Sequence, residues 1–95
     1  MEVLGISKID EGRRLYIPVA VLKELGLNKG DRVRFVKKNK VEMIPDDDGV
    51  MIDKGQRIYA TDKLVEMLEL GIGSEVVFIK EDGKITISKL IDRIR

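Results

Sequence analysis

The sequence contains no cysteine and no histidine. Without cysteine, the chain can form no disulfide, no thiolate zinc site and no cysteine nucleophile. Without histidine, it lacks the side chain that most often serves as a general base and as a metal ligand. Its serines therefore have no histidine to activate them as nucleophiles. These absences predict a protein that is not an enzyme and that binds no cofactor.

Aromatic residues are scarce as well, because tryptophan is absent and the aromatic fraction is only 4%. This scarcity nearly excludes a surface on which the bases of single-stranded nucleic acid stack. No apolar run approaches the length of a membrane span, and residues 1–20 hold no run typical of a secretory signal. We therefore expect a cytoplasmic protein without a membrane partner.

The chain has 95 residues, which predicts one domain with a small core. Charged residues make up 37% of it, while side-chain amides occur only at Asn28, Asn39 and Gln56. This composition is typical of proteins from thermophiles, the alternative being an ordinary mesophile protein rich in lysine and glutamate. The net charge of +1, taken alone, argues against a nucleic-acid partner.

The chain contains an internal repeat. Residues 9–37 align without a gap to residues 52–80, which lie 43 positions further on. The identical pairs are Ile9/Ile52, Asp10/Asp53, Gly12/Gly55, Arg14/Arg57, Tyr16/Tyr59, Leu25/Leu68, Leu27/Leu70, Gly30/Gly73, Val33/Val76, Phe35/Phe78 and Lys37/Lys80. An ungapped match that includes glycine, tyrosine, phenylalanine and arginine indicates a true duplication.

Each repeat predicts a β–α–β–β unit. Residues 13–17 and 56–60 are typical of strands, and alternating apolar residues predict hairpins over 32–43 and 76–87. A helix is expected to begin at Pro18 and end at Gly26, and its counterpart to begin at Thr61. The sequence Glu81-Asp82-Gly83-Lys84 predicts a tight hairpin turn.

A strand is expected to precede each unit, at Val3–Ile9 and, in a shorter form, at Gly49–Ile52. Pro45 through Gly49 forms the joint between the units, and it is too short to be a flexible linker. Neither unit can cover its own apolar face, so the two are expected to share one core. The tail at Leu90, Ile91 and Ile94 fits either a short helix or a last strand.

Residues 5–45 resemble the AbrB/SpoVT-type swapped-hairpin domain. The matching residues are Gly5, Asp10, Arg14, Ile17, Pro18, Leu25, Gly26, Leu27, Gly30, Asp31 and Val33. The second unit departs from that pattern at Ala60, Thr61, Glu69 and Ser74. The resemblance extends to cradle-loop barrels, which include RIFT and double-psi barrels, and leaves the strand order open.

Repeat and resemblance together predict a mostly β protein with two short helices. The expected fold is a closed, pseudo-two-fold barrel of the RIFT or swapped-hairpin type. It comprises an AbrB-like unit at 1–45, a degraded copy at 49–88 and a tail at 89–95. We expect a monomer, the alternative being two chains that exchange hairpins.

A Gly-Asp turn, or its Gly-Ser counterpart, has a structural role in each unit of this prediction. Gly30 and Gly73 permit backbone angles that other residues resist. Asp31 accepts backbone hydrogen bonds in such a turn, and Ser74 does so more weakly. We interpret these four residues as turn residues and not as catalysts.

Charge is distributed unevenly between the segments. Residues 1–45 hold ten basic and six acidic residues, whereas residues 46–95 hold eight basic and eleven acidic ones. This asymmetry permits a basic face on a nearly neutral protein. The resemblance implies contacts to DNA phosphates from Lys8, Arg13, Arg14, Lys23 and, by the repeat, Arg57. The second unit has Gln56 and Glu66 where the first has Arg13 and Lys23.

The leading hypothesis is a non-enzymatic AbrB-like protein that binds double-stranded DNA and serves as a transcription regulator. The alternative is a protein-interaction or orphan barrel, for example of antitoxin type, that has lost DNA binding. The run Asp46-Asp47-Asp48 could hold a hard cation, but a solvated loop is the better interpretation, because adjacent carboxylates do not by themselves converge on one ion.

Overall fold

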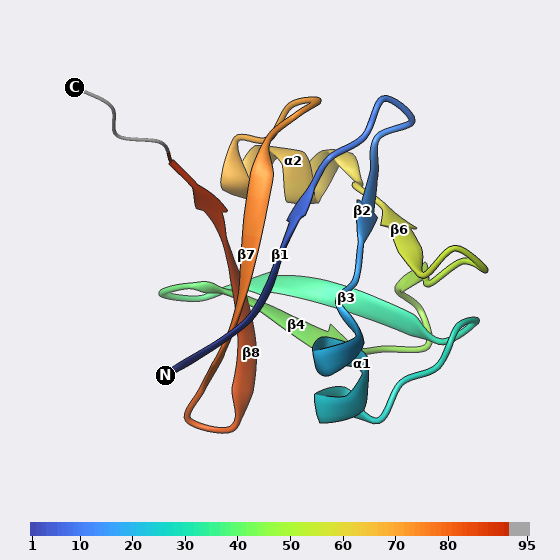
Figure 1. Ribbon diagram of the computed structural model, residues 1–95, viewed down its shortest axis with the longest axis vertical. Helices are drawn as coiled ribbons and strands as arrows, with labels where there is room; N and C mark the ends of the chain where they lie inside the picture. Colours follow the sequence, from blue (N-terminus) through green and yellow to red (C-terminus); the bar gives the residue numbers. More distant parts are fainter. Residues whose placement is uncertain (92–95) are drawn as a thin grey trace.

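The computed structural model describes residues 1–91, which form eight strands and two short helices (Figure 1). The first unit contains β1 (Glu2–Lys8), β2 (Arg14–Tyr16), α1 (Val19–Leu25), β3 (Arg32–Lys37) and β4 (Val41–Pro45). The second contains β5 (Val50–Met51), β6 (Arg57–Tyr59), α2 (Asp62–Leu68), β7 (Glu75–Glu81) and β8 (Lys84–Leu90). The predicted class, mostly β with two short helices, is confirmed.

The helix ends follow from local sequence. Pro18 precedes α1, and Gly26 ends it in the left-handed conformation with a φ of 66°. Thr61 caps α2, because its hydroxyl oxygen accepts a hydrogen bond from the Leu64 N–H at 3.3 Å. At the end of α2 the left-handed position is taken by Glu69, with a φ of 55°. Glu69 thus has a side chain at the position where the first unit has Gly26.

The hairpin turn at Asp82-Gly83 has the expected geometry. Both residues have positive φ values, 53° and 75°, as a two-residue turn between antiparallel strands requires. It joins β7 to β8, which pair along their full lengths from Glu75 opposite Leu90 to Glu81 opposite Lys84. Leu90 therefore belongs to a strand, Ile91 follows it, and the predicted tail residue Ile94 lies outside the described residues.

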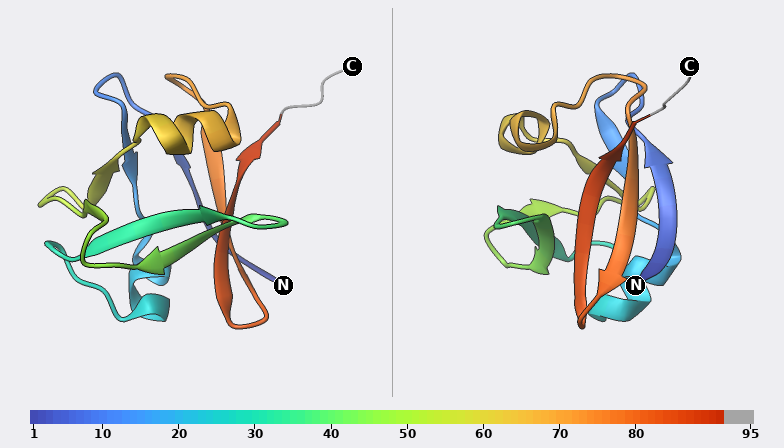
Figure 2. Two further views of the ribbon diagram at one scale, coloured as in Figure 1. Left: turned by 180° about the vertical axis from the view of Figure 1, so that it is seen from behind. Right: turned by 90° about the vertical axis from the view of Figure 1, so that its left-hand side faces the viewer.

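The two units interleave in the sheets. The six-stranded sheet has the order β1-β7-β8-β4-β3-β5, the second sheet pairs β2 with β6, and every pairing is antiparallel. The leading strand of each unit thus pairs with the other unit, β1 with β7 and β5 with β3. Exchanging the two units maps this strand order onto itself. β3 and β4 cross behind β7 and β8 in Figure 1, and the views in Figure 2 show the same two layers.

Backbone hydrogen bonds outside the strands also correspond when the two units are exchanged. The Gly30 N–H donates to the Ile52 carbonyl at 2.7 Å, and the Gly73 N–H donates to the Ile9 carbonyl at 2.8 Å. Each Gly-Asp or Gly-Ser turn is therefore held by the other unit. This reciprocity fixes the two units in one relative orientation.

The core is one cluster with contributions from both units. Leu15 and Ile58 are fully buried and lie opposite each other in the β2–β6 pair. The largest fully buried side chain is Phe78 of β7. The apolar residues that alternation along the strands marks as inward are the ones that fill this cluster, as expected for strands with one wet face.

The structure differs from the predicted bounds at several points. β2 and β6 are shorter than residues 13–17 and 56–60, because Arg13 and Gln56 adopt left-handed conformations with φ values of 63° and 65°. β1 ends at Lys8, and Ile9 continues only as an isolated bridge to Leu15.

The strand pairing yields two sheets and does not by itself close a barrel. Within residues 1–91, no helix is long and apolar enough to cross a membrane.

Candidate nucleic-acid interface

The β2–β6 pair is a short ribbon with one buried and one exposed face. Leu15 and Ile58 point into the core, so by alternation the flanking residues point outward. The four outward residues are Arg14, Tyr16, Arg57 and Tyr59, and all are exposed. Each arginine lies opposite a tyrosine of the other strand. Both tyrosines of the chain therefore lie on this one face, beside two of the predicted DNA-contact residues.

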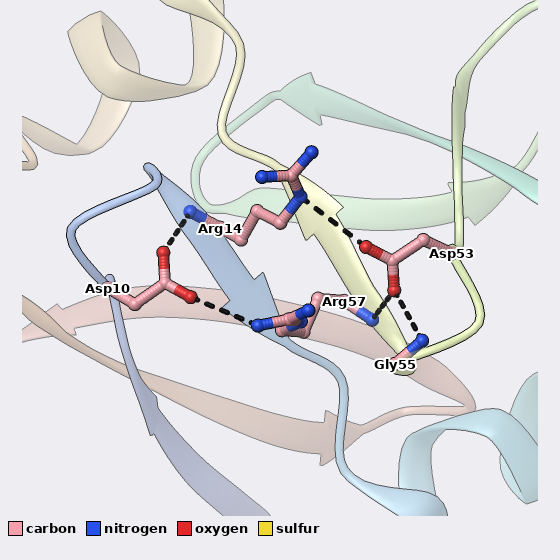
Figure 3. A network of polar contacts seen from close by, with 5 residues as sticks. All are labelled: Asp10, Arg14, Asp53, Gly55 and Arg57. Atoms are coloured by element: carbon pink, nitrogen blue, oxygen red, sulfur yellow. Dashed lines mark hydrogen bonds and ion pairs between the residues drawn. The ribbon is translucent and has the colours of Figure 1, made fainter.

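Two reciprocal ion pairs link the units at this ribbon (Figure 3). The Arg14 Nε lies 3.4 Å from the Asp53 Oδ2, and the Arg57 Nη1 lies 3.4 Å from the Asp10 Oδ2. The two pairs correspond under exchange of the units. Each arginine is thus oriented by a carboxylate from the other repeat.

The carboxylates are themselves held by backbone N–H groups. Asp10 Oδ1 accepts from the Arg14 N–H at 2.8 Å, and Asp53 Oδ1 accepts from the N–H groups of Arg57 and Gly55 at 2.9 and 2.8 Å. The Arg57 N–H is the main cause that lowers the pKa of Asp53, and the Gly55 N–H and the charges of Arg57 and Arg14 add to it, against a smaller opposing effect of burial. Asp53 is therefore ionised at neutral pH.

These ion pairs leave most donors of the arginines available. A guanidinium carries five N–H donors, and the Arg14–Asp53 contact involves one nitrogen. Figure 3 shows the other two nitrogens of Arg14 pointing away from Asp53. The side chains of Arg14 and Arg57 are 46% and 44% exposed, so an anion in solvent can reach them. A positioned guanidinium of this kind can grip a phosphate through two hydrogen bonds.

Arg13 has a different environment. Its Nε donates to the Ala60 carbonyl at 2.7 Å, its Nη2 lies 2.6 Å from the Asp62 Oδ1, and its guanidinium lies 5.1 Å from the centre of the Tyr59 ring. Gln56, its counterpart, donates to the Ile17 carbonyl at 2.8 Å. Both residues therefore tie one unit to the start of the other unit's helix, a structural role that the sequence did not reveal.

The two predicted lysines are not part of the ribbon. Lys8 ends β1 and lies opposite Glu75 of β7. Lys23 is exposed in the last turn of α1, and α1 lies at the far end of the molecule from the β1–β2 turn (Figure 1). The structure thus places Arg14 and Arg57 on one face of the ribbon, directs the Arg13 guanidinium to the start of α2, and leaves Lys8 and Lys23 outside the ribbon.

The Gly-Asp and Gly-Ser turns are held by hydrogen bonds of their own. Asp31 Oδ2 accepts from the Asn28 N–H at 2.8 Å, and Ser74 Oγ accepts from the Gly71 N–H at 2.8 Å. Gly30 and Gly73 have φ values of 97° and 88°, which favour glycine. These residues stabilise the turns that contact the other unit.

The acidic run lies against the basic strand β3. Asp46 Oδ2 is 2.7 Å from the Arg34 Nε, and Arg32 donates to the Gly49 carbonyl at 2.8 Å. The N–H of Asp48 and then Arg34 lower the pKa of Asp46, which burial opposes only in part. The fold therefore places the charges of the basic first segment beside the acidic run that follows it. Among residues 1–91, no group of three His, Cys, Asp or Glu side chains forms a metal site.

Comparison of the chain with protein-family models, curated proteins and solved structures gave no match. The similarity of residues 5–45 to the AbrB/SpoVT type thus stays a prediction from the sequence.

Proposed function

We propose that this protein is a non-enzymatic, AbrB-like DNA-binding protein and acts as a transcription regulator. The observation that carries the proposal is the placement of Arg14 and Arg57. They occupy equivalent positions on the exposed ribbon, and each is oriented by a carboxylate of the other unit. Their role is contact with duplex phosphates, which fix the orientation of a protein on DNA.

The pseudo-symmetry of the ribbon suits duplex DNA. Proteins with two-fold symmetry bind DNA sites with matching symmetry. Exchange of the two units carries Arg14 to Arg57 and β2 to β6, so one chain supplies both halves of such a contact. Outside the ribbon the two halves differ in charge, because Met51 and Glu66 stand where the first unit has Lys8 and Lys23. We therefore expect the first unit to contribute more to binding than the second.

The proposed fold is a closed pseudo-two-fold barrel of the cradle-loop type. Two contacts support closure between the sheets. The Ile9–Leu15 bridge links the end of β1 to β2, and the Asp53 N–H donates to the Arg57 carbonyl at 2.8 Å beside β5 and β6. With these links the eight strands follow one another in a ring. In such a barrel the β2–β6 ribbon forms one wall, and its outer face is open to DNA.

The test is fluorescence anisotropy of a labelled duplex at low salt. We expect binding that weakens linearly with the logarithm of salt concentration. Arg14→Ala and Arg57→Ala should each reduce affinity by about tenfold and lower the salt slope by about one. Arg34→Ala is the matched control, because it removes an ion-paired arginine of similar exposure on another strand. No binding at low salt, or equal losses for Arg34→Ala and Arg14→Ala, would refute the proposal.

A second candidate is a protein-interaction module, favoured by Tyr16 and Tyr59. Exposed tyrosines beside arginines are typical of residues that dominate protein interfaces. The ion pairs of Arg14 and Arg57 also reduce the net charge of this face. If the duplex does not bind, crosslinking in host extract should identify a protein partner. That partner should be lost with Tyr16→Ser and Tyr59→Ser, whereas capture that does not depend on the tyrosines would contradict this candidate.

A further inference from the structure

The outer face of β1 and β7 is apolar. Val3 lies opposite Ile79 and Ile6 lies opposite Val77, so the four side chains form two adjacent cross-strand pairs. Val3 and Ile6 are 57% and 52% exposed, while Ser7 between Ile6 and Lys8 is buried, which places this set on the outside. The right-hand view of Figure 2 looks onto β8, β7 and β1, and none of the helices and strands formed by residues 1–91 lies in front of them.

The repeat provides an internal reference for this face. The positions 43 residues away from Ile6, Val77 and Ile79 are Gly49, Arg34 and Val36, and the position equivalent to Val3 is Asp46. There, Arg34 and Asp46 form an ion pair of 2.7 Å. The equivalent positions thus include an ion pair, whereas the face of β1 and β7 carries four aliphatic side chains. A group of four aliphatic side chains on the surface indicates an interaction site, because contact with solvent alone does not require apolar residues.

The two charged residues beside the apolar set can pair with the same two residues of a second copy. Lys8 and Glu75 lie opposite each other in the next outward row of β1 and β7. A two-fold axis parallel to the strands stacks β1 of one copy on β7 of another. Lys8 then faces the partner's Glu75, and Ile6 faces the partner's Val77. Both copies make these contacts, as an isologous interface requires.

We propose that two copies of this chain associate through the outer face of β1 and β7. Each copy is a complete globule in this dimer, so its hairpins are not exchanged and the β2–β6 ribbon stays free. The association goes beyond the monomer expected from the repeat. The apolar set is only a few side chains wide, so the dimer is expected to be reversible and concentration-dependent.

The experiment is sedimentation analysis of the full chain over a wide range of concentrations. The wild type should shift from monomer to dimer as concentration rises. Ile6→Lys should lower the association constant by about tenfold or more, because an ammonium group would be buried without a partner. The control is Ile72→Lys, which changes an equally apolar side chain, 69% exposed, in the α2–β7 loop. Circular dichroism checks that both variants remain folded.

A charge exchange tests the partner's identity. Lys8→Glu and Glu75→Lys should each weaken self-association by about tenfold, since attractive rim pairs become repulsive. A mixture of these two variants should restore association, because each facing pair in the mixed dimer would again join a carboxylate to an ammonium group. A wild type that stays monomeric at all concentrations would overturn the proposal. So would equal effects of the substitutions at Ile6 and Ile72, or a mixture no stronger than its components.

Discussion

Arg14 and Asp53 belong to different repeats and meet 3.4 Å apart on the exposed ribbon. The carboxylate of Asp53 also accepts two backbone hydrogen bonds from its own turn. The turn of the second unit thus positions an arginine of the first unit, and Asp10 does the same for Arg57. The relation makes the candidate site a property of the pair of repeats and of neither repeat alone.

The lowered pKa of Asp53 predicts a pH dependence of stability. A carboxyl whose pKa is depressed in the folded state contributes stability above its unfolded pKa and loses it as pH falls through the folded pKa. The free energy of unfolding of the wild type should therefore decline below about pH 5. Asp53→Asn should flatten this decline, as measured by urea unfolding at a series of pH values.

Asp47→Asn is the control for this experiment. It removes an equal charge from an exposed carboxyl that, among the residues the structure describes, accepts no hydrogen bond. Its stability should follow the wild-type pH dependence. Equal flattening in both variants would mean that the backbone hydrogen bonds of Asp53 do not carry the effect.

Glu69 occupies a backbone conformation that favours glycine. Glu69→Gly should stabilise the fold by about 1 kcal/mol, because the left-handed position at a helix end then carries no side chain. Gly26→Ala should destabilise by a similar amount, since its Cβ would meet no atom within 4 Å and only the backbone is strained. Thermal and urea unfolding measure both effects. If both substitutions stabilised or both destabilised the fold, the two helix ends would not share a preference for glycine.

Gly49 lies against the backbone of β3. A Cβ at this position would overlap the carbonyl group of Val33, which is part of the strand ladder. Gly49→Ala should destabilise by about 3 kcal/mol or prevent folding, because the backbone cannot yield. Gly71→Ala, whose Cβ would meet nothing within 4 Å, should change stability by less than about 0.5 kcal/mol. A tolerated Gly49→Ala would show that β5 can move away from β3.

Cutting the chain in the Asp46–Gly49 turn should separate two fragments that cannot fold alone as monomers. In fragment 1–47, β1 lacks β7 and β3 lacks β5; in fragment 48–95 the losses correspond. Mixing the fragments should restore the native fold, seen by the dispersion of NMR signals. Any folded form of fragment 1–47 should be a dimer in which a second copy replaces the other unit. A folded monomer of either fragment would contradict the interleaved pairing.

The elements were predictable because their signals are local. Pro18, Gly26 and Thr61 mark helix ends through their own backbone and side-chain chemistry, and Asp82-Gly83 marks a turn in the same way. Helix and strand positions therefore agree with the structure to within a few residues. The shortening of β2 and β6 was not predicted, because neither arginine nor glutamine is a residue type that marks a left-handed conformation, which Arg13 and Gln56 both adopt.

The candidate site was predictable only in its list of residues. The repeat identified Arg14 and Arg57 as equivalent, but nothing local indicates that each meets a carboxylate of the other unit. The available signal in the sequence was that Asp10 and Asp53 are one of the identical pairs of the repeat. Counting charges by segment also separated Arg34 from Asp46, which the fold brings to 2.7 Å.

The sequence by itself determined the secondary structure, the duplication and the absence of the cysteine and histidine chemistry on which many enzymes depend, since composition and short-range patterns carry this information. The tertiary structure alone decided which strands pair, which arginines are oriented and which face of β1 and β7 stays apolar. Alternation along a strand tells which side chains point inward, but the neighbour of that strand depends on contacts distant in sequence. Because of those contacts, two similar repeats form one protein with an arginine-bearing ribbon of β2 and β6 and an apolar face of β1 and β7.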